Sequence, residues 1–229
     1  MKIAIVTGAS GNLGTAVVRR FIQDGYKVIG TVIPNDTTTF EFPEDSFEKT
    51  IVDLMNEEET QKFADGVIEE YNHVDVAVLT VGGFAMGSIA ETKTSDISRQ
   101  YKLNFETAYN LARHLFLNML KQGSGRIFLI GSKPGLDHKS GNGMVAYGLA
   151  KSLLFRLAEL MNAEAKGTNV VTSVIVPGTL DTTINRQSMP GANFSDWVKV
   201  EQLAELIFWY STDAASIIRE PVVKAYNRS

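Results

Sequence analysis

Short apolar runs alternate with longer stretches of helical periodicity along the whole chain. The first run, residues 2–7, is apolar and rich in β-branched side chains, which is typical of a strand buried on both faces of a parallel sheet. Helical spacing follows directly, with Leu13, Val17 and Phe21 on one stripe and Gly25 as a stop signal. The same pattern predicts further strands at residues 26–32, 50–52, 75–80, 126–130, 170–176 and 221–226. Helices are predicted between them at residues 56–71, 95–121, 147–166 and 201–210.

Strands that alternate with helices without a break, a repeat or a linker indicate one domain. We therefore expect an α/β fold, a Rossmann-type doubly wound parallel sheet, over residues 1–229. Residues 34–48 contain two prolines and a run of threonines, and are expected to form an irregular connection. A second irregular segment, about fifteen residues around Pro190, Gly191 and Trp197, is long enough to act as a lid.

A glycine-rich turn joins the first predicted strand to the first predicted helix. Glycines permit a tight turn and a close backbone approach to a diphosphate, while the helix N-terminus adds free N–H groups and partial positive charge. A dinucleotide is therefore expected to bind at Thr7, Gly8, Ser10, Gly11, Asn12, Leu13 and Gly14.

The end of the second predicted strand bears on the choice of cofactor. In dinucleotide-binding folds this position often carries an acidic residue for the ribose 2′-hydroxyl, or a basic one for a 2′-phosphate. Residues 30–35 contain no acidic and no basic residue, so the sequence does not decide between NAD and NADP. Because no acidic residue is present to repel a 2′-phosphate, the expectation leans weakly towards NADP. Asp53, with Leu54 beside it, follows the third strand where an adenine would be held, although a cap on the next turn explains Asp53 equally well.

Two residues near the start of the helix at 147–166 offer acid–base chemistry. Tyr147 and Lys151 are four positions apart, which places both side chains on one helix face. A positive charge beside a phenol favours the phenolate, so we expect the pKa of Tyr147 to lie below its usual value of about 10. Such a group suits the reduction of a carbonyl or imine, which needs a proton.

Other candidate site residues lie at strand ends and in one helix. Ser132 follows the fifth predicted strand, at the edge where open α/β sheets bind ligands. Val81, Gly82 and Gly83 follow the fourth and let the backbone pass close to a flat group. Asn104 sits among apolar neighbours, where an amide is costly unless it is hydrogen-bonded.

Composition excludes several classes of protein. The 229-residue chain is 44% hydrophobic and 21% charged with a net charge of −4, as in a globular protein with a full core. The acidic balance argues against nucleic acid or an anionic membrane as a partner. No cysteine is present and the three histidines are far apart, so no metal site is expected. No apolar run approaches the ~18 residues of a membrane span, and a cytoplasmic enzyme is the expectation.

The candidate residues together resemble the short-chain dehydrogenase/reductase family. The pattern is Thr7-Gly8…Gly14, Asn104, Ser132, Tyr147, Lys151 and Pro177-Gly178…Thr182 in this order, and it covers essentially the whole chain. Within the family, the stretches 81–85, 147–151 and 177–197 are similar to quinonoid dihydropteridine reductases. The resemblance implies further cofactor contacts at Val81, Gly82, Gly83, Tyr147, Lys151, Pro177, Gly178, Thr179, Leu180 and Thr182, the last of them to the nicotinamide carboxamide.

The resemblance also implies a role for each catalytic candidate. Tyr147 would donate the proton, Lys151 would tune it and hold the nicotinamide ribose, and Asn104 would anchor a water. Ser132 would polarise the group being reduced; Ser140 is the alternative, because the gap from Ser132 to Tyr147 is longer than is usual in the family. A hydride would pass from nicotinamide C4 to a small-molecule substrate, a carbonyl or imine compound such as a pterin.

The chain departs from the dihydropteridine reductases at three positions. Those enzymes carry a small apolar residue in place of Ser132, usually no amide in place of Asn104, and an acid near Val32. The chain thus joins the fuller catalytic set of carbonyl reductases to the C-terminal segment of the pteridine enzymes. The family resemblance further implies a homodimer or homotetramer, paired through the helices at 95–121 and 147–166.

Two other functions are compatible with parts of the pattern. A catalytically inactive, dinucleotide-binding regulatory protein would use the same fold, but the full catalytic set speaks against it. An extended-type nucleotide-sugar epimerase fits the glycine spacing at 8, 11 and 14, but the chain is short for its added substrate domain.

Overall fold

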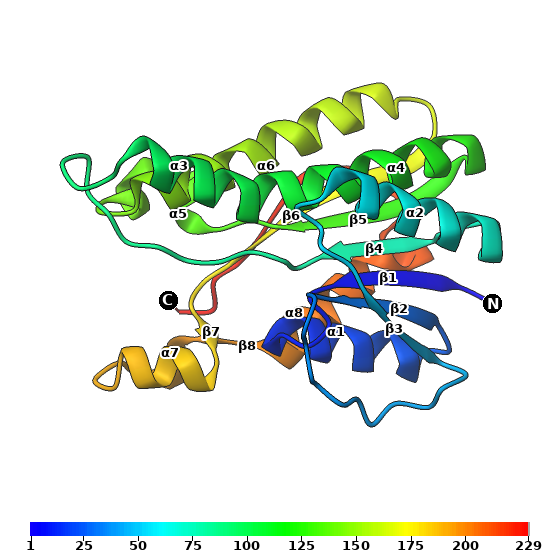
Figure 1. Cartoon of the computed structure of the whole chain (residues 1–229), viewed down its shortest axis with the longest axis horizontal. Coiled ribbons are helices and arrows are strands. Elements are labelled where there is room, and N and C mark those ends of the chain that lie inside the picture. The colour runs from blue at the N-terminus through cyan, green and yellow to red at the C-terminus, as the bar shows by residue number, and fades with distance from the viewer. Residues whose placement is uncertain (229) are drawn as a thin grey trace.

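A seven-stranded parallel sheet forms the centre of the computed structural model, which describes residues 1–228 (Figure 1). The strand order is β3-β2-β1-β4-β5-β6-β9. The strands are β1 (Ile3–Thr7), β2 (Lys27–Val32), β3 (Phe47–Ile51), β4 (Val76–Leu79), β5 (Ser124–Ile130), β6 (Asn169–Pro177) and β9 (Val222–Ala225). Every pairing within this sheet is parallel. The Rossmann-type doubly wound fold expected from the sequence is confirmed.

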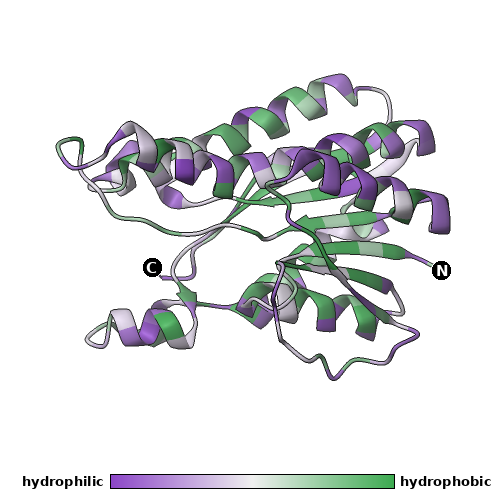
Figure 2. Cartoon of the chain, viewed as in Figure 1, coloured by the Kyte–Doolittle hydropathy of each residue, from purple (hydrophilic) through white to green (hydrophobic). Residues whose placement is uncertain are grey.

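Helices cover both faces of the sheet. On one face α2 (Glu57–Tyr71), α4 (Thr107–Gln122) and α6 (Val145–Glu164) share a core with the strands. On the other face α1 (Asn12–Gln23) and α8 (Val200–Ser211) build a second core. Figure 2 shows apolar strands between helices whose outer faces are largely polar. Because the sheet is covered on both sides, central strands such as β1 are buried at every position.

The chain winds away from the middle of the sheet in two directions. It passes from β1 to β2 on one side and from β4 to β5 on the other, although β1 and β4 are direct neighbours. Such a switch point opens a crevice outside the carboxyl ends of the strands. The glycine turn after β1, residues 81–83 after β4, Ser132 after β5 and residues 177–182 within and after the end of β6 therefore gather at one edge.

The helix expected at residues 95–121 contains a distortion. It consists of α3 (Thr94–Tyr101), a π-helical segment (Lys102–Glu106) and α4, in unbroken succession. The wider π turn adds a residue to the helix, and such turns often occur at functional sites. Asn104 lies at the centre of this segment and is fully buried.

Two other predictions of local structure are corrected. β3 begins at Phe47 rather than at residue 50, because this edge strand alternates between buried and exposed positions and so lacks a continuous apolar run. The segment expected to be irregular around Pro190 contains a short helix, α7 (Thr183–Ser188). It lies between the short paired strands β7 (Leu180–Asp181) and β8 (Val198–Lys199), and Figure 1 shows it projecting beyond the carboxyl edge of the sheet.

The loop after β5 folds into short helices. α5 (Lys133–Leu136) begins directly after Ser132, and a 3₁₀ turn (His138–Gly141) follows it. The Ser132 hydroxyl accepts a hydrogen bond from the amide N of Gly135, 3.3 Å away, and so caps α5. This cap fixes Ser132 at the start of the loop.

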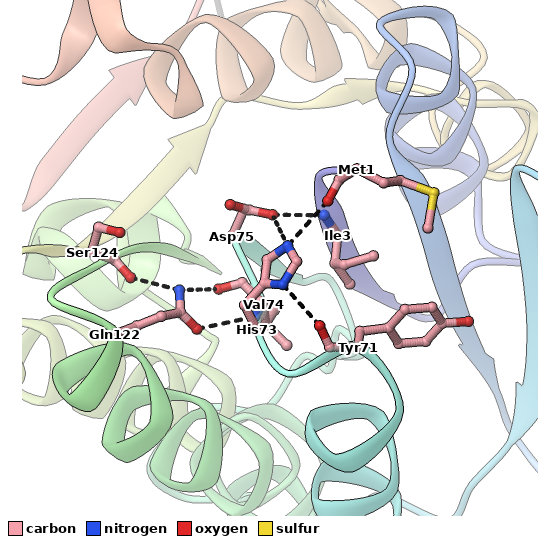
Figure 3. A network of polar contacts seen from close by, with 8 residues as sticks. All are labelled: Met1, Ile3, Tyr71, His73, Val74, Asp75, Gln122 and Ser124. Atoms are coloured by element: carbon pink, nitrogen blue, oxygen red, sulfur yellow. Dashed lines mark hydrogen bonds and ion pairs between the residues drawn. The ribbon is translucent and has the colours of Figure 1, made fainter.

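A polar network closes the opposite, amino edge of the sheet (Figure 3). One member of the network is Gln122, the last residue of α4. Its side-chain N donates to the carbonyls of Val74 and Ser124 at 3.0 and 2.9 Å, and its side-chain O accepts from the amide N of Val74 at 3.1 Å. The network ties the end of α4 to the strands on either side.

Candidate active site

The glycine turn has the geometry of a cradle for a diphosphate. Gly8 has a positive φ of 62°, and a Cβ atom on Gly14 would lie only 2.0 Å from the carbonyl O of Gly8, so both positions require glycine. Helix α1 starts after Gly11, with no side chain capping it and no acidic residue in its first turn. Its first N–H groups and its partial positive charge are thus available to an anion, and the residues present fit a dinucleotide.

A slot lies beside the glycine turn. Its lining brings together Gly8, Val32, Asp53, Leu54 and Val81. The predicted residues Asp53 and Leu54 therefore meet Val81, which follows a different strand. The Asp53 carboxylate also accepts a hydrogen bond from the amide N of Met55 at 3.0 Å, so the residue both lines the slot and caps the next turn.

Asp36 contacts the glycine turn, although the sequence did not single it out. Its carboxylate accepts a hydrogen bond from the hydroxyl of Ser10, in the glycine turn, at 2.6 Å, and only 11% of the Asp36 side chain is exposed. Asn35 has a positive φ of 67°, and this turn directs Asp36 back towards the glycine turn. Asparagine is the non-glycine residue most at ease there, so the pair Asn35-Asp36 was the available signal.

The Ser132 hydroxyl faces the Tyr147 phenol and favours its phenolate form. Ser132 is 7% exposed, and the loop after β5 holds it against the first turn of α6. The serine that meets Tyr147 is therefore Ser132, whereas Ser140 lies in the 3₁₀ turn, where its amide N donates to the carbonyl of Asp137.

The expected lowering of the Tyr147 pKa is wrong for the protein without cofactor. Burial raises the pKa of the Tyr147 phenol, and the Ser132 hydroxyl offsets only part of that rise. Lys151 lies one turn further along α6, but its ammonium donates a hydrogen bond to the carbonyl of Ile130, 2.7 Å away. Desolvation decides the direction, because it penalises the phenolate.

Lys151 is a buried cation. The residue is 5% exposed, and burial lowers the pKa of its ammonium to about 8. A Cβ atom on Gly82 would lie 3.0 Å from the Lys151 ammonium N and 2.7 Å from the side-chain O of Asn104. Only a glycine at position 82 therefore lets these two side chains approach the backbone from β4.

The buried side-chain amide of Asn104 is hydrogen-bonded, as its burial requires. Its side-chain N donates to the carbonyl of Gly83 at 2.9 Å and to the side-chain O of Gln100 at 2.8 Å. Its side-chain O accepts from the amide N of Gly83 at 3.0 Å. The amide thus fixes the strand-end loop at residues 82 and 83 from the π-helical segment.

The segment after β6 reaches the same edge. The amide N of Gly178 donates to the carbonyl of Ala225 at 2.9 Å, which extends the pairing of β6 with β9. The Thr182 hydroxyl caps α7 by accepting from the amide N of Asn185 at 3.2 Å. This cap fixes where α7 begins.

Phe84 is a second residue that the sequence did not single out for the site. Its ring meets the Tyr147 ring edge to face, with centroids 5.2 Å apart, and 61% of the residue is exposed. An aromatic side chain that is exposed while touching a partly buried phenol presents an apolar surface beside that phenol.

Metal binding and membrane insertion find no support in the structure. Within residues 1–228, no three histidine or acidic side chains are grouped as metal ligands. No helix in that part of the chain combines the length and apolar character that crossing a bilayer requires.

A diphosphate cradle beside a partly buried phenol and a buried ammonium defines the class of nicotinamide-dependent oxidoreductases. A family model described as short chain dehydrogenase matches residues 2–193. The chain belongs to the short-chain dehydrogenase family, and it is an NAD(P)-dependent reductase or dehydrogenase.

Named relatives include two reductases. The chain is 31% identical over 221 residues to a dihydropteridine reductase of Dictyostelium discoideum, with 94% of this chain and 90% of the relative covered. It is 28% identical over 184 residues to an acetoacetyl-CoA reductase of an Acinetobacter species, with 77% and 73% covered. A short-chain dehydrogenase/reductase structure from Mycobacterium ulcerans superposes with a TM-score of 0.88 at 22% identity, covering 99% of this chain and 88% of that one.

Proposed function

We propose that this protein reduces a small carbonyl or imine compound with NADH or NADPH, and that Tyr147 donates the proton. The observation that carries the proposal is the placement of the Tyr147 phenol beside the buried Ser132, at the sheet edge that holds the glycine turn. Ser132, rather than Ser140, is the catalytic serine in this proposal.

The protein's own groups handle the proton. The bound nicotinamide supplies the hydride that forms the new C–H bond at the substrate carbon. As the π electrons of the C=O or C=N bond move onto oxygen or nitrogen, the Tyr147 hydroxyl protonates that atom and Ser132 donates a hydrogen bond to it. Because burial raises the pKa of Tyr147, the phenol keeps its proton near neutral pH, as a donor must.

Lys151 and Asn104 support this step in different ways. In this proposal the Lys151 ammonium, one helical turn along α6, leaves the carbonyl of Ile130 to stabilise the phenolate left after proton transfer. Lys151 also holds the nicotinamide ribose in this proposal, as the family resemblance implies. Asn104 is a positioning residue, because it bonds the backbone of Gly83 on both its donor and its acceptor side. The water that the resemblance assigns to Asn104 stays a prediction.

The cofactor would lie along the carboxyl edge of the sheet. The diphosphate would rest on the glycine turn, at Thr7, Gly8, Ser10, Gly11, Asn12, Leu13 and Gly14. The adenine would occupy the slot with Asp53, Leu54 and Val81. The nicotinamide half would lie against Gly82, Gly83, Tyr147, Lys151, Pro177, Gly178, Thr179, Leu180 and Thr182.

A dihydropterin is the first substrate to test. The exposed ring of Phe84 against Tyr147 offers a stacking surface for a flat heterocycle. The 31% sequence identity to a dihydropteridine reductase, which covers 94% of this chain, supports the same substrate class. Simple ketones and aldehydes belong in the same panel, because Ser132 and Asn104 complete the set used by carbonyl reductases.

The variant Tyr147→Phe tests the proposal. Turnover with NADH or NADPH on the panel should fall by about 10³-fold, since a positioned general acid contributes about 10²- to 10⁴-fold. The Kd for the nucleotide, measured by fluorescence titration, should stay within about twofold of the wild-type value, because the phenyl ring remains. Tyr210→Phe, on α8 away from the site, is the matched control.

An unchanged rate in Tyr147→Phe would exclude Tyr147 as the proton donor. Wild-type protein that binds nucleotide but transfers no hydride to any member of the panel would instead favour the catalytically inactive regulatory protein. The two results are distinguishable because the first requires turnover and the second requires its absence.

The proposal includes a homodimer or homotetramer in the cytoplasm, where reduced nicotinamide nucleotides are available. Apolar side chains stand exposed on the outer sides of α4 and α6, among them Leu117, Leu149, Leu153 and Leu160. Their exposure supports pairing of these helices across a two-fold axis. A monomer by light scattering would contradict this part of the proposal.

A further inference from the structure

Residues 225–228 form a strap along the carboxyl edge of the sheet, at and after the end of β9. Beside it stands the segment 178–198, which carries α7 and projects beyond the sheet (Figure 1). The first end of this segment bonds the strap, since the amide N of Gly178 donates to the carbonyl of Ala225 at 2.9 Å. Its second end bonds the strap through Asn227.

Asn227 holds the second end of the segment with its side chain. Its side-chain N donates to the carbonyls of Ser195 and Trp197 at 3.1 and 2.9 Å. The backbone of Asn227 is left-handed, with a φ of 52°, a conformation that asparagine adopts more readily than most residues. The next residue, Arg228, adds a bond from its amide N to the carbonyl of Asp196 at 3.3 Å. Position 227 thus combines a backbone that favours asparagine with contacts that need an N–H donor.

The two ends of the segment are joined to each other. The amide N of Val198 donates to the carbonyl of Thr179 at 2.8 Å, and β7 pairs with β8. A bond that fixes the second end therefore also fixes residues 178–182, where the nicotinamide ring would lie. We propose that Asn227 is a positioning residue for the nicotinamide ring, an inference that rests on the function proposed above.

A series of contacts continues from the second end into α7. The buried Trp197 ring packs against the Phe194 ring, with centroids 4.8 Å apart. The Arg186 guanidinium of α7 lies 4.9 Å from the centre of the Phe194 ring. The same guanidinium donates to the Asp181 carboxylate at 2.6 and 2.8 Å. Contacts thus connect α7 to the residues whose backbone Asn227 bonds.

The strap also contacts the loop of the proposed catalytic serine. Lys133 directly follows Ser132, and its ammonium lies 4.3 Å from the centre of the Tyr226 ring. Tyr226 is partly buried against the same core as α6. The strap therefore contacts both the loop that holds Ser132 and the segment 178–198. Its position bears on the distance between the catalytic groups and the nicotinamide ring.

The test compares two kinds of ligand in binding titrations. One is the reduced cofactor, NADH or NADPH, whichever the wild type binds more tightly. The other is ADP-ribose, or its 2′-phosphate for NADPH, which keeps the adenine, the diphosphate and both riboses but lacks the nicotinamide ring. A residue that positions the ring should affect the first ligand alone, whereas a general loss of structure should affect both.

Two variants of Asn227 and one control are needed. Asn227→Gly removes the donor and keeps a residue at ease in the left-handed backbone. Asn227→Asp keeps the size but replaces the donor by acceptor oxygens. Asn72→Gly is the matched control, since Asn72 ends α2 with a φ of 63° and its side chain bonds no group among the described contacts.

We expect Asn227→Gly to raise the Kd for the reduced cofactor about fivefold and to leave the Kd for the ADP-ribose ligand within about twofold of the wild-type value. Asn227→Asp should raise the Kd for the reduced cofactor at least as far, because a carboxylate cannot donate to the two carbonyls. In the nucleotide-free protein, amide hydrogen exchange at Gly178 and Val198 should be faster in both variants. Asn72→Gly should match the wild type in all three measurements.

An unchanged Kd for the reduced cofactor in Asn227→Gly, or an equal rise for both kinds of ligand, would overturn the inference. Unchanged amide exchange at Gly178 and Val198 would overturn it as well. Failure of the wild type to bind NADH and NADPH would overturn the proposed function too. Turnover that depends on Tyr147, together with cofactor binding that is unaffected by changes at Asn227, would overturn this inference alone.

Discussion

The two edges of the sheet use polar groups in opposite ways. At the amino edge the Asp75 carboxylate accepts from the amide N of Ile3 at 2.7 Å. The ring nitrogens of His73 lie 2.8 and 3.0 Å from the carbonyl oxygens of Tyr71 and Met1 (Figure 3). Each side chain bonds backbone from another part of the chain, so this edge contributes to stability.

At the carboxyl edge the Tyr147 phenol and the Lys151 ammonium have fewer hydrogen-bond partners. Burial raises the pKa of Tyr147 and lowers that of Lys151 to about 8. The first turn of α1 has no side-chain cap. Here burial disfavours the charged forms of Tyr147 and Lys151. Groups with pKa values shifted in this way are typical of sites that bind a ligand and carry out a reaction. The comparison predicts that removing a polar group lowers activity at the carboxyl edge and lowers stability at the amino edge.

The largest expected effect is that of Lys151→Met. Turnover should fall at least about 100-fold, because the phenolate of Tyr147 loses its cation. The free energy of unfolding of the nucleotide-free protein should rise by up to about 3 kcal/mol near pH 7, since each pKa unit is worth about 1.4 kcal/mol. Chemical denaturation checks this, with Lys166→Met, an exposed lysine beyond α6, as the control.

The pH dependence of that gain follows from the shift of the Lys151 pKa. The pKa of Lys151 is about 8 in the folded protein and 10.5 for an unperturbed lysine. Below pH 8 both the folded and the unfolded state therefore carry the proton, and the cost of burying the charge is complete. Between these values the unfolded state binds more protons, and wild-type stability rises with pH. The advantage of Lys151→Met should therefore shrink from pH 8 to above pH 10. A constant difference would show that the ammonium is not desolvated.

Arg126→Met probes the amino edge. The buried guanidinium donates to the carbonyls of Gly125 and Asn169 and to the side chain of Asn169, at 2.9, 2.6 and 3.0 Å. Leaving these acceptors unpaired should lower the free energy of unfolding by about 1–3 kcal/mol. The kcat should stay unchanged, because β5 presents Arg126 and Ser132 at opposite ends. A loss of kcat without a loss of stability would break the comparison.

Gln122→Met is expected to have the smallest effect. It removes the bonds to Val74 and Ser124 at the edge of the network, which should cost about 1–2 kcal/mol of stability. Activity at 25 °C should match that of the wild type. Thermal unfolding measures the stability of the variant, and a separate assay measures its activity. A loss of activity together with the loss of stability would show that the amino and carboxyl edges are coupled.

The sequence alone determined the elements, the sheet type and most of the candidate site. Strand positions follow from apolar runs, the glycine turn follows from its spacing, and Tyr147 and Lys151 fall on one helix because four residues make about one turn. The gathering of Ser132, residues 81–83 and residues 177–182 at one edge was also foreseeable, since parallel strands end together. These are properties of local pattern and of topology.

Tertiary structure decided what depends on partners distant in the sequence. The pKa of Tyr147 is raised, against expectation, because desolvation depends on how much protein packs around the phenol. Asp36 contacts the glycine turn because Asn35 turns the chain back on Ser10. The π turn at Asn104 exists alongside its bonds to Gly83 and Gln100. Periodicity describes which face of an element is buried, whereas these outcomes depend on which atoms meet once the faces have packed.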